Sequence, residues 1–366
     1  MTLERWLERK EVCVCAGSGG VGKTTASAAI AAGMASRGKK VAVLTIDPAK
    51  RLATSLGLPE LGNEKTLVDP ERLRAAGFEP RGELWAMMLD AKRTFDEIVE
   101  RNAPDAATRD AVLGNRIYQE LSNAVAGSQE YMAMEKLHEL HQEGRYDLLV
   151  LDTPPSRNAL DFLDAPRRLS QFVDSRSLQF FSGASRRGLG LVGRGTGLLF
   201  SVLKRATGLD LLTDLSEFFS AFGEMSGGFR DRAERVEALL ADSRTTFLLV
   251  TSPRHAAVQE AVFFHHRLLD AGLPFGGVIV NRMRELPGSG SGSDGVAGLE
   301  KLLDKELARK VARNFEDYVR LAERDQLNLE QLQEQIGRTP MITVPDLPGD
   351  VHDIEGLARM DEHLFS

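Results

Sequence analysis

The sequence predicts an α/β fold in which a doubly wound, mostly parallel sheet carries an inserted helical subdomain. Short, nearly continuous apolar runs alternate with helical patterns, as in parallel strands that are covered on both faces. A glycine-rich segment joins the first run to an alanine-rich stretch, and two long stretches show helical periodicity without good strands. The strand-like runs are residues 12–15, 41–46, 148–151, 246–251, 278–280 and 341–344.

The ends of two helices are marked by glycine, which commonly follows the last turn of a helix. Residues 24–37 are rich in alanine and stop at Gly38, and residues 256–270 stop before Gly272. We expect a single domain over residues 1–366, with the core formed by 10–80, 146–159 and 241–366. The helical subdomain is expected at about 84–145 and 160–240.

Composition narrows the class of protein. A chain of 366 residues with 42% hydrophobic content can bury a large core. Its net charge of -7 provides no overall field for a nucleic-acid backbone, so we expect no nucleic-acid partner. Charged residues interrupt every stretch of roughly 18 residues, and we expect no transmembrane segment. Cys13 and Cys15 are too close in sequence for an ordinary disulfide, which favours reduced thiols and a cytoplasmic location.

The segment GSGGVGKTT at residues 17–25 has the spacing of a phosphate-binding loop and lies between a strand and a helix. Glycines allow positive φ and let backbone amides approach phosphate, and the helix N-terminus adds its dipole. Lys23 is expected to reach the β- and γ-phosphates of a nucleotide, and the Thr24 hydroxyl to hold Mg²⁺. The alternative is a glycine-rich turn that only packs a helix on a sheet. The loop residues expected to bind nucleotide are Gly19, Gly20, Val21 and Gly22.

Two carboxylates follow predicted strands. Asp152 ends the run LLVLD, a position that orients Mg²⁺ and its waters opposite a phosphate-binding loop, although a buried strand can also end at a turn Asp. Asp47, in TIDPAKRL, lies at the carboxyl edge of the sheet, where ligands bind in such folds. Its expected role is to position or deprotonate an attacking water, and the alternative is a helix N-cap before Pro48.

The segments GSGGVGKTT, TIDPAKRL, LDTPPSRNALDFL and VIVNRM resemble the deviant phosphate loop, two switches and base-binding segment of the arsenite-pump / tail-anchored-protein-targeting ATPase family. The resemblance covers nearly the whole chain. It implies ATP and Mg²⁺ as ligands, with Asp47 handling the water and Asp152 in the second metal shell, and we assign Thr24, Asp47 and Asp152 to the metal site. It also implies roles at the phosphates for Lys23, Thr24 and Thr25, and at the base and ribose for Asn281, Pro345, Asp346 and Leu347.

The sequence departs from that family pattern in its loop. The family has a lysine at the second loop position, which reaches the phosphates of a dimer partner, and this chain has Ser18. Losing a cation should slow phosphoryl transfer unless another cation replaces it. Arg157 and Lys50 are the candidates, and we assign Arg157 to the catalytic group; a lysine-bearing paralogue could instead complete a mixed dimer. Because the chain has one nucleotide-binding half, we expect a homodimer or such a heterodimer.

Other departures concern metals. No Cys-x-x-Cys pair is present to clasp zinc between subunits, and both cysteines lie on the first predicted strand, which argues against arsenite pumping. Apolar helical residues between 198 and 225 suggest a groove for a hydrophobic protein client, but such stripes more often pack a core.

The leading hypothesis is a Mg²⁺-dependent ATPase whose ATP binding and hydrolysis switch the helical subdomain, which acts on a protein or membrane-associated partner. One alternative is a nucleotide-responsive chaperone or scaffold with negligible hydrolysis. Another is a partition-type ATPase.

Overall fold

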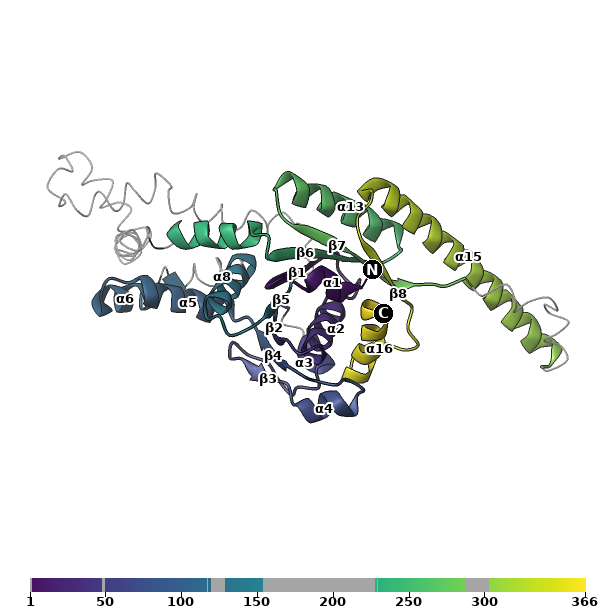
Figure 1. Ribbon diagram of the computed structural model, residues 1–366, viewed down its shortest axis with the longest axis horizontal. Coiled ribbons are helices and arrows are strands. Elements are labelled where there is room, and N and C mark those ends of the chain that lie inside the picture. Colours follow the sequence, from purple (N-terminus) through teal and green to yellow (C-terminus); the bar gives the residue numbers. More distant parts are fainter. Residues whose placement is uncertain are drawn as a thin grey trace, which may run out of the picture.

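The computed structural model describes residues 2–47, 50–116, 118–119, 129–153, 228, 230–286 and 303–366. Its centre is an eight-stranded sheet in the order β3-β4-β2-β5-β1-β6-β7-β8 (Figure 1). Every neighbouring pair is parallel except β3 with β4. The predicted doubly wound, mostly parallel sheet is therefore confirmed. The strands are β1 (Val12–Ala16), β2 (Lys40–Thr45), β3 (Thr66–Leu67), β4 (Glu83–Met88), β5 (Leu148–Asp152), β6 (Thr245–Thr251), β7 (Phe275–Met283) and β8 (Met341–Pro345).

Helices cover both faces of the sheet (Figure 1). One face packs against α1 (Leu3–Leu7), α2 (Lys23–Ser36), α3 (Arg51–Ser55), α4 (Pro70–Ala75) and α16 (Ile354–Phe365). The hydrophobic cluster on the other face includes residues of α5 (Ala91–Asn102), α6 (Ala106–Leu113), α8 (Gln129–Gln142), α13 (His255–Asp270) and α15 (Lys305–Ile336). Of these helices, α6 packs against α5 and α15 packs against α13. The bounds of α2 and α13 match the predicted helices 24–37 and 256–270 to within one residue at each end.

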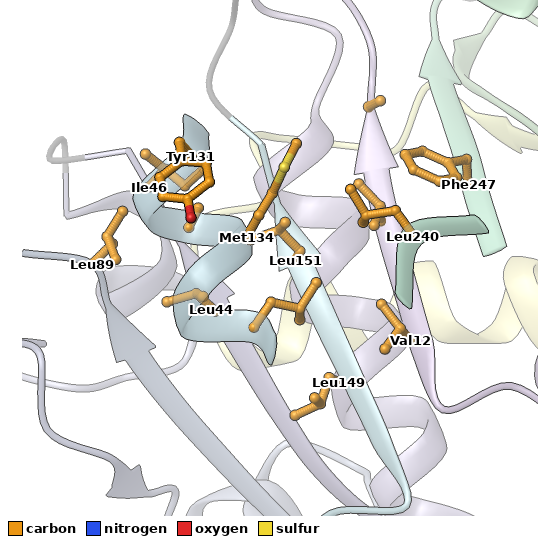
Figure 2. Packing of buried hydrophobic residues seen from close by; sticks show 14 of the residues in the cluster. Val12, Leu44, Ile46, Leu89, Tyr131, Met134, Leu149, Leu151, Leu240 and Phe247 are labelled. Atoms are coloured by element: carbon orange, nitrogen blue, oxygen red, sulfur yellow. The ribbon is translucent and has the colours of Figure 1, made fainter. Parts of the chain in front are cut away.

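Alternation along β1 explains why its sequence is apolar throughout. Val12 and Val14 belong to one hydrophobic cluster, and Cys13 and Cys15 belong to the other. A central strand with both faces buried has no position left for a polar side chain. Figure 2 shows the first cluster, where side chains of α8, such as Met134, lie over the central strands.

The prediction that residues 84–145 lack strands is wrong at the start of that stretch. Residues Glu83–Met88 form β4, which pairs in parallel with β2 from Lys40↔Glu83 to Thr45↔Met88. The remainder of the stretch contains α5, α6 and α8, as its helical periodicity indicated. Of the second expected helical stretch, 160–240, the structure describes residues 228 and 230–240, which are helical. The division into core and helical subdomain stays a prediction.

The C-terminal helix α16 packs against α2, the helix that follows the glycine-rich loop. Gly33 permits this contact, because a Cβ there would lie 2.1 Å from Asp361 Oδ1. Arg37 donates to Asp361 over 3.2 Å, and its guanidinium lies 3.9 Å from the centre of the Phe365 ring. These contacts hold α2 in place below the loop. Among the helices in the described part of the chain, none is both long and apolar enough to cross a membrane.

Candidate nucleotide-binding site

The glycine-rich loop joins the central strand β1 to α2 and depends on glycine at defined positions. Gly17, Gly20 and Gly22 have φ values of 147°, 77° and 93°, a region that side chains disfavour. A Cβ on Gly17 would lie 2.0 Å from the Val250 carbonyl oxygen, and one on Gly22 would lie 2.3 Å from Asn281 Nδ2. The sequence therefore folds this loop tightly against the ends of β6 and β7, with its backbone available to a ligand.

Lys23, at the start of α2, lies inside the loop. Its side chain is 6% exposed, and its Nζ donates to the Ser18 carbonyl oxygen over 2.8 Å. Burial lowers the pKa of Lys23, and the nearby Asp152 and Asp47 carboxylates oppose that shift. The result is an ammonium group held across the loop by one backbone contact, which a phosphate oxygen can replace.

Asp152, the last residue of β5, is the most deeply buried carboxylate of the site, with 0% exposure. Thr24 and Thr45 both donate their hydroxyls to its Oδ2 over 2.8 Å. Burial raises the pKa of Asp152 to about 6, although the two hydrogen bonds and Lys23 act in the opposite direction. A buried charge of this kind is costly without a cation.

The arrangement fits Mg²⁺. Asp152 Oδ1 is buried and has no hydrogen-bond partner within the described residues, although its other oxygen has two. Hard oxygen donors suit Mg²⁺, which usually keeps several waters and takes the rest of its shell from one or two carboxylates and phosphates. Thr24 and Asp152 would hold the ion, directly or through water. Asp47 follows β2, which is separated from β1 by β5 in the sheet. No cluster of three or more His, Cys, Asp or Glu occurs in the part of the chain that the structure describes.

Asp47 follows β2, next to β5 in the sheet. Its backbone N–H donates to Thr45 Oγ1 over 3.2 Å, and its Oδ2 lies 3.9 Å from Arg51 Nη1. The structure therefore places the two predicted carboxylates at the same edge of the sheet, each linked to Thr45. Such a pair can orient both a metal and a water molecule near a phosphate.

Asn281, in β7, contacts the loop from the side of β1 opposite to β5 and β2. Its Nδ2 donates to the Val21 carbonyl oxygen over 2.9 Å, and its Oδ1 accepts from the Arg282 N–H over 3.0 Å. Arg282 has φ 61°, the left-handed region that is rare outside glycine. The Asn281 amide therefore links the glycine-rich loop to the Arg282 peptide of β7, whose backbone departs from extended geometry at that residue.

A cavity of about 640 Å³ opens above the loop and brings most of the predicted residues together. The predicted residues that line it are Gly20, Gly22, Lys23, Thr24, Thr25, Asp47, Asn281, Pro345, Asp346 and Leu347. Gly19, Val21 and Asp152 do not line it: Gly19 is exposed, Val21 contributes a carbonyl to Asn281, and Asp152 is buried beneath Thr24. Arg157 lies outside the described residues.

Sequence reasoning missed the arginines of this cavity. Its lining includes Arg51, Arg254, Arg282 and Arg284. Arg284 Nη1 lies 2.9 Å from Oδ2 of Asp325, a residue of α15 that is 2% exposed. The sequence does contain a signal for them, because each arginine lies within a few residues of the end of a predicted strand. The carboxyl ends of parallel strands lie at one edge of the sheet, where ligands bind.

The fold and the site together define an α/β protein of the phosphate-binding-loop nucleotide class. A central parallel strand leads through a glycine-rich turn to a helix that begins Lys-Thr, and a buried Asp ends the neighbouring strand β5. This combination is the structural context that the loop motif requires.

Comparison with known proteins gives the family. A family described as Anion-transporting ATPase matches residues 10–324, so the chain belongs to that family. It is 23% identical over 366 residues to a protein named ATPase get3 of Schizosaccharomyces japonicus, covering 100% of this chain and 96% of that protein. It is 25% identical over 363 residues to Putative arsenical pump-driving ATPase 1 of Aquifex aeolicus, covering 97% of this chain and 78% of that protein. The family resemblance found in the four sequence segments is thereby confirmed.

Proposed function

We propose that this chain binds Mg²⁺·ATP in the cavity above the glycine-rich loop and hydrolyses ATP. The observation that carries the proposal is the hydrogen-bonded set of Lys23, Thr24 and Asp152, assembled from the loop helix and a neighbouring strand. Membership of the Anion-transporting ATPase family supports it, as do the names of the relatives, which are ATPases.

Each residue of the site has a defined part in this proposal. The loop amides and Lys23 neutralise the phosphate oxygens, while Thr24 and Asp152 hold Mg²⁺, which spreads the charge that develops on the phosphates. Asp47 orients the attacking water. Asn281 and the segment Pro345 to Leu347 enclose the base and ribose, since they line the cavity on the side of β7 and β8.

The test is ATP turnover by the purified full chain with Mg²⁺, compared with Lys23→Ala. We expect phosphate release that the variant lacks, because it removes the one ammonium group in the loop. An exposed lysine such as Lys310, on α15, provides a matched control as Lys310→Ala. Equal phosphate release by wild type and Lys23→Ala would show that the activity comes from elsewhere.

A second candidate is a nucleotide-responsive chaperone or scaffold with negligible hydrolysis, favoured by Ser18 at the loop position where the resembling family has lysine. Calorimetric binding of ATP together with no turnover above Lys23→Ala would select it. In either case we propose a homodimer, or a heterodimer with a lysine-bearing paralogue, that works in the cytoplasm on a hydrophobic protein client. Residues 198–225, on which the client groove rests, lie outside the described residues. Failure of the ATP-loaded protein to keep a hydrophobic segment in solution would remove the client from the proposal.

A further inference from the structure

We propose that Arg51 supplies the positive charge at the transferred phosphate that Ser18 cannot provide. The inference rests on the proposed ATP hydrolysis and names a catalytic residue for it. Ser18 contributes only a neutral hydroxyl and a carbonyl oxygen, and the carbonyl already accepts from Lys23. A transition state that spreads negative charge over phosphate oxygens gains from a second cation, and arginine matches those oxygens with two donors.

The position of Arg51 suits this role. It is the first residue of α3 and follows Asp47 by four positions, at the carboxyl edge of the sheet. Its side chain is 65% exposed and lines the cavity, while its Nη1 lies 3.9 Å from Asp47 Oδ2. The guanidinium is therefore beside the carboxylate assigned to the water and has room to turn toward a phosphate.

The order of strands separates Arg51 from the other arginines of the cavity. Mg²⁺ and water are expected near β2 and β5, where Asp47 and Asp152 lie, and Arg51 follows β2. Arg254 follows β6, and Arg282 belongs to β7, on the opposite side of β1, where Asn281 also lies. Among the cavity-lining arginines of the described chain, Arg51 is the one that follows a strand on the β2 and β5 side of β1.

Other cations near the site have partners that hold them elsewhere. Arg284 pairs with the buried Asp325. Lys50, one of the two substitutes suggested by the sequence, pairs with Glu60 over 3.0 Å and does not line the cavity. The pairing of Arg51 with Asp47 is longer, at 3.9 Å, and the Arg51 side chain is 65% exposed, so a phosphate can replace this contact at small cost.

The reaction balances without any further reactant. The water oxygen forms a bond to the γ-phosphorus, the bond from that phosphorus to the β-phosphate oxygen breaks, and ADP and inorganic phosphate leave. The proton of the water passes to Asp47 or to solvent. Arg51 moves from Asp47 to the γ-phosphate oxygens and neutralises part of their charge.

The experiment measures kcat for ATP, and calorimetric affinity for two probes, in wild type and in Arg51→Ala. The probes are a nonhydrolysable ATP analogue and ADP with aluminium fluoride, which resembles the transferred phosphate. We expect Arg51→Ala to lower kcat about 100-fold and to weaken the aluminium fluoride complex, with the analogue affinity changed less than about threefold. Arg51→Lys should recover part of kcat, since it restores a charge without the two-pronged geometry.

Arg81→Ala is the matched control, because Arg81 is exposed and precedes β4 at the amino edge of the sheet, away from the site. Retained analogue affinity in Arg51→Ala shows that the variant is folded. A kcat within threefold of wild type would overturn the inference, and so would a loss in Arg254→Ala without one in Arg51→Ala. If wild type itself shows no turnover above Lys23→Ala, the proposed hydrolysis fails first, which the same assay distinguishes.

Discussion

The buried carboxylate of Asp152 predicts an unusual substitution, one that stabilises the free protein while it disables the site. Burial raises the pKa of Asp152 from 3.8 to about 6, so the folded protein binds this proton more tightly than the unfolded chain does. Folding stability is therefore lost as pH rises from about 4 to 6, and above 6 the whole penalty is present. One pKa unit corresponds to about 1.4 kcal/mol, which gives about 3 kcal/mol at pH 7.5.

Asp152→Asn removes this penalty and keeps the shape of the side chain. The amide oxygen can still accept the hydroxyls of Thr24 and Thr45, and the amide nitrogen carries no charge. The amide N–H groups replace the unpartnered Oδ1, and their burial offsets part of the gain. In the absence of Mg²⁺ and nucleotide, we expect the variant to exceed wild type in free energy of unfolding by up to about 3 kcal/mol at pH 7.5. At pH 5 the difference should fall to about half of that value.

Urea unfolding of both proteins at the two pH values provides the measurement. Asp317→Asn serves as the control, because Asp317 is an exposed carboxylate on α15 and its substitution should change stability by less than about 0.5 kcal/mol. With Mg²⁺·ATP the order should reverse, since only wild type gains the metal contact. A variant that is less stable than wild type at pH 7.5, or a difference that does not change with pH, would refute the reasoning.

Three further substitutions test other parts of the site. Gly22→Ala introduces a Cβ 2.3 Å from Asn281 Nδ2 at φ 93°, so nucleotide affinity measured by calorimetry should fall at least about tenfold; unchanged affinity would contradict the role of the tight loop. Asn281→Ala removes the side-chain contacts to Val21 and Arg282 and, with Asn281 at the base as proposed, should reduce the difference in affinity between ATP and GTP; a difference equal to that of wild type would place base recognition elsewhere. Asp325→Ala leaves the Arg284 guanidinium without its buried partner, and chemical unfolding should show a loss of about 3 kcal/mol, which a loss below 0.5 kcal/mol would disprove.

The sequence allowed most of the core to be predicted, because a strand that is buried on both faces must be apolar along its length. This holds for β1 and for the inner parts of β5 and β6. All residues of these strands are buried, and the polar ones, Asp152, Thr245, Thr246 and Thr251, lie at the strand ends. β4 was missed because its residues ELWAMM also fit a helical period, and its strand conformation depends on pairing with β2, a contact remote in sequence.

The candidate site could be predicted where a motif fixes the chemistry, as at Lys23 and Thr24. The arginines could not be predicted in the same way. Arg51 and Arg254 enter the cavity because of how strand ends and helix starts are placed in space, and their position after a predicted strand is a weaker signal than a motif. Local spacing encodes the loop, whereas the surrounding charges depend on the tertiary arrangement.

The ion pair between Arg284 and Asp325 connects the long helix α15 to the cavity. Arg284 lines the cavity, Asp325 lies within α15, and the same helix leads into β8, whose last residue, Pro345, also borders the cavity. At 1.5 Å per residue, the arm from Asp325 to Lys305 is roughly 30 Å long, and Figure 1 shows it projecting away from the sheet. A tilt of about 10° at this pivot would carry the far end through about 5 Å. Such a tilt would convert a small rearrangement around a bound ligand into a larger displacement at a point remote from it.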